Sequence, residues 1–324
     1  MEAQEKRLGF KENNAIIYGP VLSRRFGHSL GIDIIPFKVC PYDCVYCQLG
    51  KTTIKTLERK KYADIDFQDF KKQVKKNINS HPDIKYISFS GSGEPTLNIL
   101  ISRYISEIKE ITDIPVLVLT GGATLSSQGV IDDICNADLI KVSLDAPSSI
   151  LLKKINRPAP GVEFEKNIEG LKKLSDKFKG KIWLEVMILN KINDSAACGH
   201  MFKDIIETLE GRIEKIHLNT AVRFPAEDGL SLPDIDNIKK IKEILGEKAE
   251  IIDKASGTEY RGDIINLEKK VLQLLKRRPS TAKDIGLSLG LNINEIIKVC
   301  RWLEDKGRIS SLNNKYIILR SNNL

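Results

Sequence analysis

Strand-sized apolar segments alternate with amphipathic segments through the first 255 residues, and this alternation restricts the possible folds more than any other feature. It predicts parallel strands joined by right-handed helical crossovers. The expected strands are Gly31–Ile35, Tyr86–Ser90, Val116–Thr120, Leu139–Leu144, Trp183–Ile188 and Lys215–Asn219. The expected helices are Phe67–Ile78, Leu97–Ile111, Gly129–Cys135, Phe164–Phe178 and Met201–Leu209. A doubly wound sheet and a full or partial barrel share this pattern, so the fold class is α/β.

The pattern changes after about residue 255, where three short helical segments precede two short strand-like segments. The third helical segment has an apolar face that includes Ile296 and Cys300, so Cys300 is expected in a core. Three helices followed by a hairpin predict a winged helix–turn–helix whose third helix is the recognition helix. We therefore expect two domains, residues 1–255 and 256–324, joined by a linker at residues 253–263.

Charge is distributed unevenly along the chain. The net charge is +8, and twelve basic against five acidic residues from Ile265 to the end contribute +7 of it. Such a segment favours a polyanionic partner such as RNA, although a solvated lysine-rich face is the commoner meaning of such charge. The residues expected to contact RNA are Lys298, Arg301, Trp302, Lys276, Arg277 and Arg278. A protein-docking role for this domain remains an alternative.

The N-terminal segment is polar, and the sequence has no apolar run of about 18 residues. We therefore expect a cytoplasmic protein with no membrane partner. Its cysteines form no disulfide framework: Cys135 and Cys198 are isolated, as is Cys300, and the other three lie within eight positions. In a reducing compartment such a cluster indicates metal binding or catalysis.

The clustered cysteines are Cys40, Cys44 and Cys47, in the stretch CPYDCVYCQLG. Structural zinc takes four protein ligands, and no second paired motif supplies a fourth here. Thiolates also hold iron–sulfur clusters, and three thiolates on a [4Fe–4S] cube leave one iron open to a small molecule. The spacing favours the iron–sulfur site, with zinc as the alternative.

The CxxxCxxC spacing, with Tyr46 just before the last cysteine, resembles the radical SAM superfamily. The resemblance implies a [4Fe–4S] cluster with Cys40, Cys44 and Cys47 as its ligands, and S-adenosylmethionine (SAM) on the open iron. It also implies an electron donor of the flavodoxin or ferredoxin type. Reductive cleavage of SAM would yield a 5′-deoxyadenosyl radical that abstracts hydrogen from substrate, chemistry that belongs to the cofactor.

Further segments match the family's SAM-binding positions. Gly91, Gly93 and Glu94 follow the second expected strand, where the family places a Gly-Gly-Glu segment against the methionine amino group. Ser143 and Asp145 end the fourth strand, where related enzymes contact the SAM ribose, although an Asp there is often only a helix cap. Together with Tyr46, these residues are the expected SAM contacts. Gly121 stands where many relatives carry Asn, so we expect no ligand role for it.

Within the superfamily, segments such as FSGSGEPTLN, KVSLDAP and LNTAVRFPAE resemble the wyosine-synthase-related branch. This resemblance covers roughly residues 18–255 and implies a partial, six-stranded (β/α) barrel with its site at the carboxyl ends of the strands. Wyosine base synthase has additional upstream cysteines, whereas residues 1–39 contain none. The expected reaction is therefore limited to radical SAM chemistry without the pyruvate condensation.

The substrate-side candidates are less specific. Arg24, Arg25 and His28 lie just before the first expected strand, and guanidinium groups bind phosphate or carboxylate. A solvated surface and a structural histidine are the competing interpretations. Residues that could point into the barrel or line its mouth are Glu185, Asn219, Arg223 and Glu227.

Three functions follow from these observations. The first is an RNA-modifying enzyme that acts on tRNA. The second is radical modification of a peptide, protein or small metabolite, with the winged helix as a docking module. The third, an iron–sulfur DNA-binding regulator, leaves the Glu94 loop and six strand–helix units without a purpose.

Overall fold

A computed structural model describes residues 16–23, 26–62, 65–209, 212–221, 230–252, 258–289, 291, 293–312 and 315–318. The chain divides into two compact units, a larger one that takes in residues 19–254 and a smaller one that takes in residues 255–324. No helix in these described ranges is both long enough and apolar enough to span a membrane.

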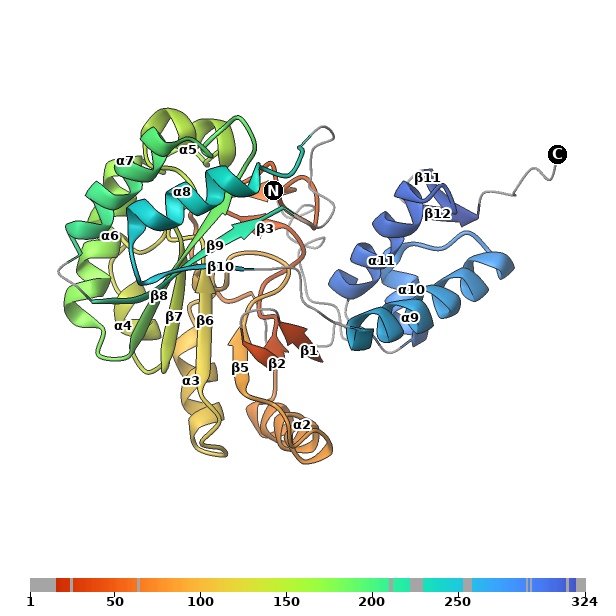
Figure 1. Ribbon diagram of the computed structural model, residues 1–324. Helices are drawn as coiled ribbons and strands as arrows, with labels where there is room; N and C mark the ends of the chain where they lie inside the picture. The colour runs from red at the N-terminus through yellow and green to blue at the C-terminus, as the bar shows by residue number, and fades with distance from the viewer. Residues whose placement is uncertain are drawn as a thin grey trace. The chain divides into compact units, whose positions relative to one another are not determined.

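The larger unit is built on one eight-stranded sheet with the order β1-β2-β5-β6-β7-β8-β9-β10 (Figure 1). Neighbouring strands from β2 to β10 all pair in parallel. The strands are β1 Ile17–Ser23, β2 Gly27–Ile32, β5 Tyr86–Phe89, β6 Val116–Thr120, β7 Leu139–Ser143, β8 Lys181–Ile188, β9 Ile213–Thr220 and β10 Ala249–Ile251. The expected parallel α/β fold is therefore confirmed, and β1 and β10 extend it beyond the six expected strands.

Helices follow most of these strands. They are α2 Phe67–Ser80, α3 Ile101–Lys109, α4 Val130–Ile134, α5 Ser149–Ile155, α6 Phe164–Lys177, α7 Ala196–Glu207 and α8 Ile235–Leu245, with a 3-10 turn η1 at Pro95–Leu97. They pack in the pairs α2 with α3, α3 with α4, α4 with α6, α5 with α6, and α7 with α8. The prediction of one helix over Leu97–Ile111 is wrong, because Asn98 leaves helical backbone angles and its side chain donates to the Ile34 carbonyl.

Side chains alternate between the two faces of the sheet, as the two-residue period of strands requires. One face carries apolar residues such as Val118, Ile140 and Leu184, all fully buried. The opposite face carries Lys141, Glu185, His217 and Asn219, and we call it the polar face. One face of the sheet is therefore apolar at these positions, and the other carries charged and polar side chains.

The position predicted for the first strand, Gly31–Ile35, is wrong. The strand is β2, Gly27–Ile32, and its last paired residue, Ile32, lies opposite Phe89. Ile34 and Ile35 are buried in the following loop, so their burial comes from packing rather than from strand pairing. The shift moves His28 into the strand.

The smaller unit consists of three helices and a hairpin. Helices α9 Thr258–Arg277, α10 Ala282–Leu289 and α11 Ile293–Asp305 precede the antiparallel pair β11 Ile309–Leu312 and β12 Lys315–Ile318. Its core contains Val271, Ile285 and Leu303 together with Cys300, which is fully buried. The expectation that Cys300 is a core residue is confirmed.

Candidate functional site

The loop that carries the three clustered cysteines is fixed by backbone hydrogen bonds on two sides. Its first cysteine, Cys40, ends the two-residue strand β3 Val39–Cys40, which pairs with β4 Ile54–Lys55. On the other side, Asp43 N–H donates to the Asn156 carbonyl at 2.8 Å and Val45 N–H to the Ile155 carbonyl at 2.9 Å. Carbonyls at a helix C-terminus lack intrahelical partners, so the end of α5 serves as an anchor for the loop.

Each of the three sulfurs accepts a hydrogen bond from a nitrogen of the protein. Tyr42 N–H lies 3.5 Å from Cys40 Sγ. Asn156 Nδ2 donates to Cys44 Sγ at 3.3 Å. Lys38 Nζ donates to Cys47 Sγ at 3.1 Å. N–H donors aimed at sulfur stabilise the thiolate form, which is the form that binds metal.

Burial opposes that ionisation when no positive charge is bound. It raises the pKa of Cys40 to about 12, with a further contribution from the Glu94 carboxylate. Burial also raises the pKa of Cys44 well above its usual value, aided by Asp145 and by the two neighbouring thiols. Three thiols grouped in this partly buried site therefore need a bound cation in order to ionise together.

This donor set fits an iron–sulfur cluster. In the described part of the chain, no three His, Cys, Asp or Glu side chains are arranged around one metal-ion position. A [4Fe–4S] cube takes each thiolate on a different iron, so it does not require the sulfurs to surround a single point. Hydrogen bonds to the ligating sulfurs are also a usual means of tuning such clusters.

The glycine-rich loop after β5 packs directly against the start of the cysteine loop. A Cβ on Gly93 would lie 2.0 Å from the Val39 carbonyl oxygen, and one on Gly91 would lie 2.4 Å from the Asp33 carboxyl carbon. Asp33 accepts hydrogen bonds from Ser92 N–H at 3.1 Å and from its hydroxyl at 2.6 Å. Because neither glycine has a side chain, the glycine-rich loop can lie directly against the Val39 backbone and the Asp33 carboxylate.

Glu94, expected against the methionine amino group, is buried and anchored. Its Oε1 accepts from Thr96 N–H and from the hydroxyls of Thr96 and Thr120, and its Oε2 accepts from Gly121 N–H at 2.7 Å. Burial raises the pKa of Glu94, although these hydrogen bonds oppose the rise. A carboxylate oxygen has two lone pairs, so Oε2 keeps capacity for one further donor.

Asp145, expected at the SAM ribose, connects three elements. Its Oδ2 accepts from the Tyr46 hydroxyl and from Asn156 Nδ2 at 3.0 Å, and its Oδ1 accepts from Met187 N–H at 3.1 Å. Burial raises the pKa of Asp145, against the lowering effect of these bonds. The carboxylate therefore positions Tyr46 and Asn156 relative to the cysteine loop.

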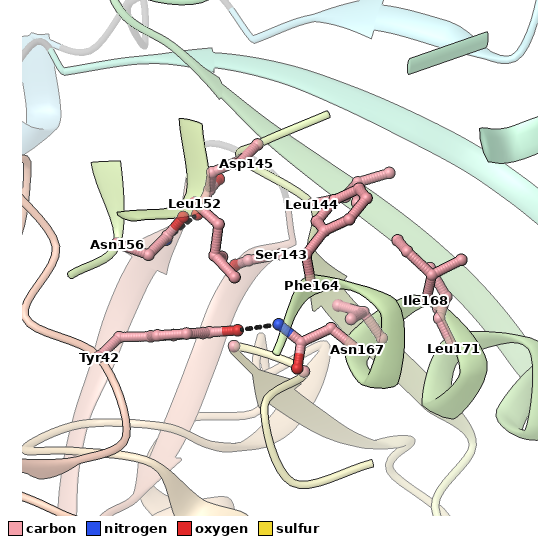
Figure 2. A pocket seen from close by; sticks show the side chains of 14 residues that line it. Tyr42, Ser143, Leu144, Asp145, Leu152, Asn156, Phe164, Asn167, Ile168 and Leu171 are labelled. Carbon is pink, nitrogen blue, oxygen red and sulfur yellow. Dashed lines mark hydrogen bonds between the residues drawn. The ribbon is translucent and has the colours of Figure 1, made fainter. Parts of the chain in front are cut away.

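A small cavity of about 30 Å³ lies beside this network, between the cysteine loop, the end of β7 and helices α5 and α6 (Figure 2). Ser143 and Asp145 line it, as does Tyr42, whose hydroxyl accepts from Asn167 Nδ2 at 2.7 Å. The Oδ1 atoms of Asn156 and Asn167 are buried, and neither has a partner in the described structure. Two acceptors beside a space of this size suit an ordered water or a donor group of a ligand.

The polar face of the sheet carries a buried ion pair. Lys141 Nζ bonds to Glu185 Oε2, and Asn219 Nδ2 donates to Glu185 Oε1 at 2.9 Å. All three residues are more than nine-tenths buried. The strand register places Glu185 opposite Ser143, the last residue of β7. The Lys141–Glu185 ion pair therefore lies close to the carboxyl ends of the strands.

Replacing Lys141 by methionine is expected to lower the free energy of unfolding by roughly 3–5 kcal/mol, because the Glu185 carboxylate loses its buried counter-charge. The double variant Lys141→Met/Glu185→Leu should lose less than the single variant, since it buries no unmatched charge. Guanidinium unfolding followed by circular dichroism would measure both. A double variant less stable than Lys141→Met would contradict this role for the pair.

Some predicted residues are not brought to this site. His28 lies near the start of β2, where its Nδ1 bonds to Asp83 and its carbonyl accepts from Lys85 N–H. The cysteine loop follows the opposite end of that strand, so His28 is not beside it. Arg24, Arg25, Arg223 and Glu227 lie outside the described residues.

Two residues that the sequence reasoning did not select, Lys38 and Asn156, contact the sulfurs. Asn156 is the C-cap of α5, a short helix whose N-cap, Ser148, is a recognisable start signal. Lys38 carries no comparable signal. It lies two residues before the motif, and only the path of the loop directs its side chain to Cys47.

Comparisons with known proteins agree with this geometry. Residues 34–208 match the Radical SAM superfamily. The chain is 35% identical over 275 residues to the UPF0026 protein MJ1312 of Methanocaldococcus jannaschii, covering 82% of this chain and 83% of that protein. It is 33% identical over 301 residues to a protein named GTPase Obg from Brachyspira hyodysenteriae, covering 90% of this chain but only 43% of that relative's length.

Among solved structures, a radical SAM methyltransferase from Sphaerobacter thermophilus shares the fold with a TM-score of 0.51 at 17% identity. The match covers 69% of this chain and 65% of that one. Members of the matched family carry a [4Fe–4S] cluster and bind SAM. The chain belongs to the radical SAM superfamily of enzymes.

Proposed function

We propose that this protein reductively cleaves SAM at a [4Fe–4S] cluster held by Cys40, Cys44 and Cys47, and that the resulting radical modifies RNA, with tRNA as the expected class. The observation that carries the cofactor assignment is the set of three N–H···S hydrogen bonds around these sulfurs. When bound, the cluster supplies the electron that splits the sulfonium to a 5′-deoxyadenosyl radical.

The chain's own residues would bind and orient SAM around that cluster. The remaining lone pair of Glu94 Oε2 suits the methionine ammonium, and Gly91 and Gly93 allow the loop to approach the cysteine loop closely. Asp145 would act by positioning Tyr46, and Ser143 lines the cavity beside it. The barrel would open at the carboxyl ends of the strands, where these residues lie.

The smaller unit supports an RNA substrate. We propose that its three helices and hairpin form a winged helix–turn–helix. Lys276 and Arg278 are exposed, and so are Lys283, Lys306 and Lys315. Trp302, expected to be exposed on the recognition helix, is instead half-buried against the core with Lys306 Nζ 4.4 Å from its ring centroid. The side chains of Arg277, Lys298 and Arg301 lie outside those that the structure describes.

Binding to tRNA is therefore expected to weaken steeply as salt rises, because lysine and arginine side chains that neutralise phosphates release counterions. Replacing Lys276 and Arg278 by glutamate should lower the slope of log K against log salt by about 1 for each phosphate that the variant no longer neutralises. Lys75→Glu, an exposed lysine on α2 of the larger unit, is the matched control and should bind as the wild type does. Gel-shift titrations at several salt concentrations would measure this.

Absent or salt-insensitive tRNA binding would contradict the RNA proposal and favour a peptide, protein or small metabolite as substrate. The complementary experiment compares the masses of modified nucleosides in RNA from cells with and without the gene. A nucleoside that disappears with the gene would identify the product. Identical nucleoside profiles, together with intact SAM cleavage, would indicate that the substrate is a peptide, a protein or a small metabolite.

A further inference from the structure

Lys38 has an unusual placement for a lysine. Only 3% of its surface is exposed, and its Nζ donates to Cys47 Sγ at 3.1 Å. The backbone around it is held on both sides: Lys38 N–H donates to the Ser92 carbonyl at 2.7 Å, and its own carbonyl accepts from Ile54 N–H at 3.1 Å. Its φ of 58° lies in the left-handed region, which side-chain-bearing residues seldom adopt. A strained, doubly anchored backbone thus directs this side chain toward the sulfur.

A buried ammonium requires a counter-charge. Within the described ranges no carboxylate forms an ion pair with Lys38, and its Nζ donates instead to the Cys47 sulfur. The natural counter-charge for Lys38 is therefore the negative charge of the thiolate ligands themselves.

The three sulfurs differ in the charge of their donors. Cys40 and Cys44 accept from neutral groups, the Tyr42 backbone amide and the Asn156 side-chain amide, at 3.5 and 3.3 Å. Cys47 accepts from a cation over a shorter distance, 3.1 Å. Hydrogen bonds with an ionised partner are shorter and stronger than neutral ones, so Lys38 has the largest electrostatic effect of the three donors.

We propose that Lys38 sets the reduction potential of the cluster by holding a positive charge against Cys47. This inference rests on the proposed function. Reduction adds one electron to a cluster that three thiolates have already made anionic, and no bond forms or breaks in that step. A fixed cation stabilises the reduced state more than the oxidised state, and it therefore raises the potential. The electron comes from a one-electron donor of the flavodoxin or ferredoxin type.

The experiment is a redox titration of the reconstituted full-length protein, following the electron paramagnetic resonance signal of the reduced cluster. Lys38→Met removes charge and donor, Lys38→Gln removes the charge but keeps a donor, and Lys38→Arg keeps both. Lys55→Met is the matched control, since Lys55 is exposed on β4 and donates to the Arg157 carbonyl instead of a sulfur. Iron and sulfide content and circular dichroism confirm loading and folding of each variant.

Lys38→Met and Lys38→Gln are expected to lower the reduction potential of the cluster. At a fixed ambient potential, the ratio of reduced to oxidised cluster should fall at least tenfold, and a tenfold change corresponds to about 59 mV for one electron. Lys38→Arg and Lys55→Met should titrate close to the wild type. Wild-type potentials in both charge-removing variants would overturn the proposal. So would loss of the cluster from all three Lys38 variants, which would indicate a purely structural role. A wild-type protein that assembles no cluster would instead refute the proposed function.

Discussion

Replacing Cys44 by alanine is expected to leave a folded protein that no longer retains its iron–sulfur cluster. Cys44 lies at the centre of the cysteine loop, where its sulfur accepts from Asn156 Nδ2 and its burial makes free ionisation costly. The loop's backbone bonds to α5 come from Asp43 and Val45 and do not depend on the sulfur. Iron and sulfide content and the visible absorption of anaerobically reconstituted protein would show the loss.

Cys135→Ala is the matched control for this variant. Cys135 is half-buried at the end of α4, and the charged groups that act on its thiol are Asp132 and Lys177. The Cys135→Ala protein should retain iron and sulfide at the wild-type level. Equal cluster content in the Cys44→Ala and Cys135→Ala proteins would contradict the assignment of the three thiols as ligands.

Gly93→Ala is expected to destabilise the larger unit by about 3 kcal/mol or more, because the new Cβ would lie 2.0 Å from the Val39 carbonyl oxygen and 2.7 Å from Ile35 Cγ2. The obstructing atom is backbone, and Glu94 N–H donates to that same carbonyl at 3.1 Å. Relief would require the glycine-rich loop and β3 to separate, which would also move Cys40. Denaturant unfolding of the cluster-free protein would measure the loss.

Gly129→Ala separates this steric effect from backbone strain. Gly129 has a φ of 78°, and a Cβ added there would meet no atom within 4 Å, so its replacement costs strain alone, roughly 1–2 kcal/mol. Gly93→Ala should therefore be the more destabilised of the two. A Gly93→Ala protein as stable as Gly129→Ala would show that the two loops do not pack as closely as the structure describes.

The regular part of the fold could be predicted because the strands are short, apolar and evenly spaced. The β6 strand begins and ends as the sequence predicts, and most of the others differ by one or two residues. The first parallel strand could not be placed correctly, because Ile34 and Ile35 are as apolar as a strand but pack within a loop. The three-residue strand β10 could not be found, since so short a segment has no measurable period.

The candidate site, like the fold, was predictable from the sequence only in part. The cysteines and the residues Gly91 to Glu94 lie in contiguous motifs, and the fold brings these segments together at the carboxyl ends of β2 and β5. Lys38 and Asn156 could not be found by pattern, because their roles depend on where side chains point across distant segments. Asn156 is 112 residues away from Cys44 in the chain, and only the packing of α5 against the loop joins them.

The central claim is that the missing fourth ligand of the three-cysteine site is SAM, cleaved reductively. Its most direct test is the yield of 5′-deoxyadenosine from anaerobically reconstituted protein supplied with SAM and a strong one-electron reductant. We predict 5′-deoxyadenosine from the wild-type protein and none above background from Cys44→Ala. Equal yields from the two proteins, or no product from a wild-type protein that carries its full iron and sulfide, would contradict the claim.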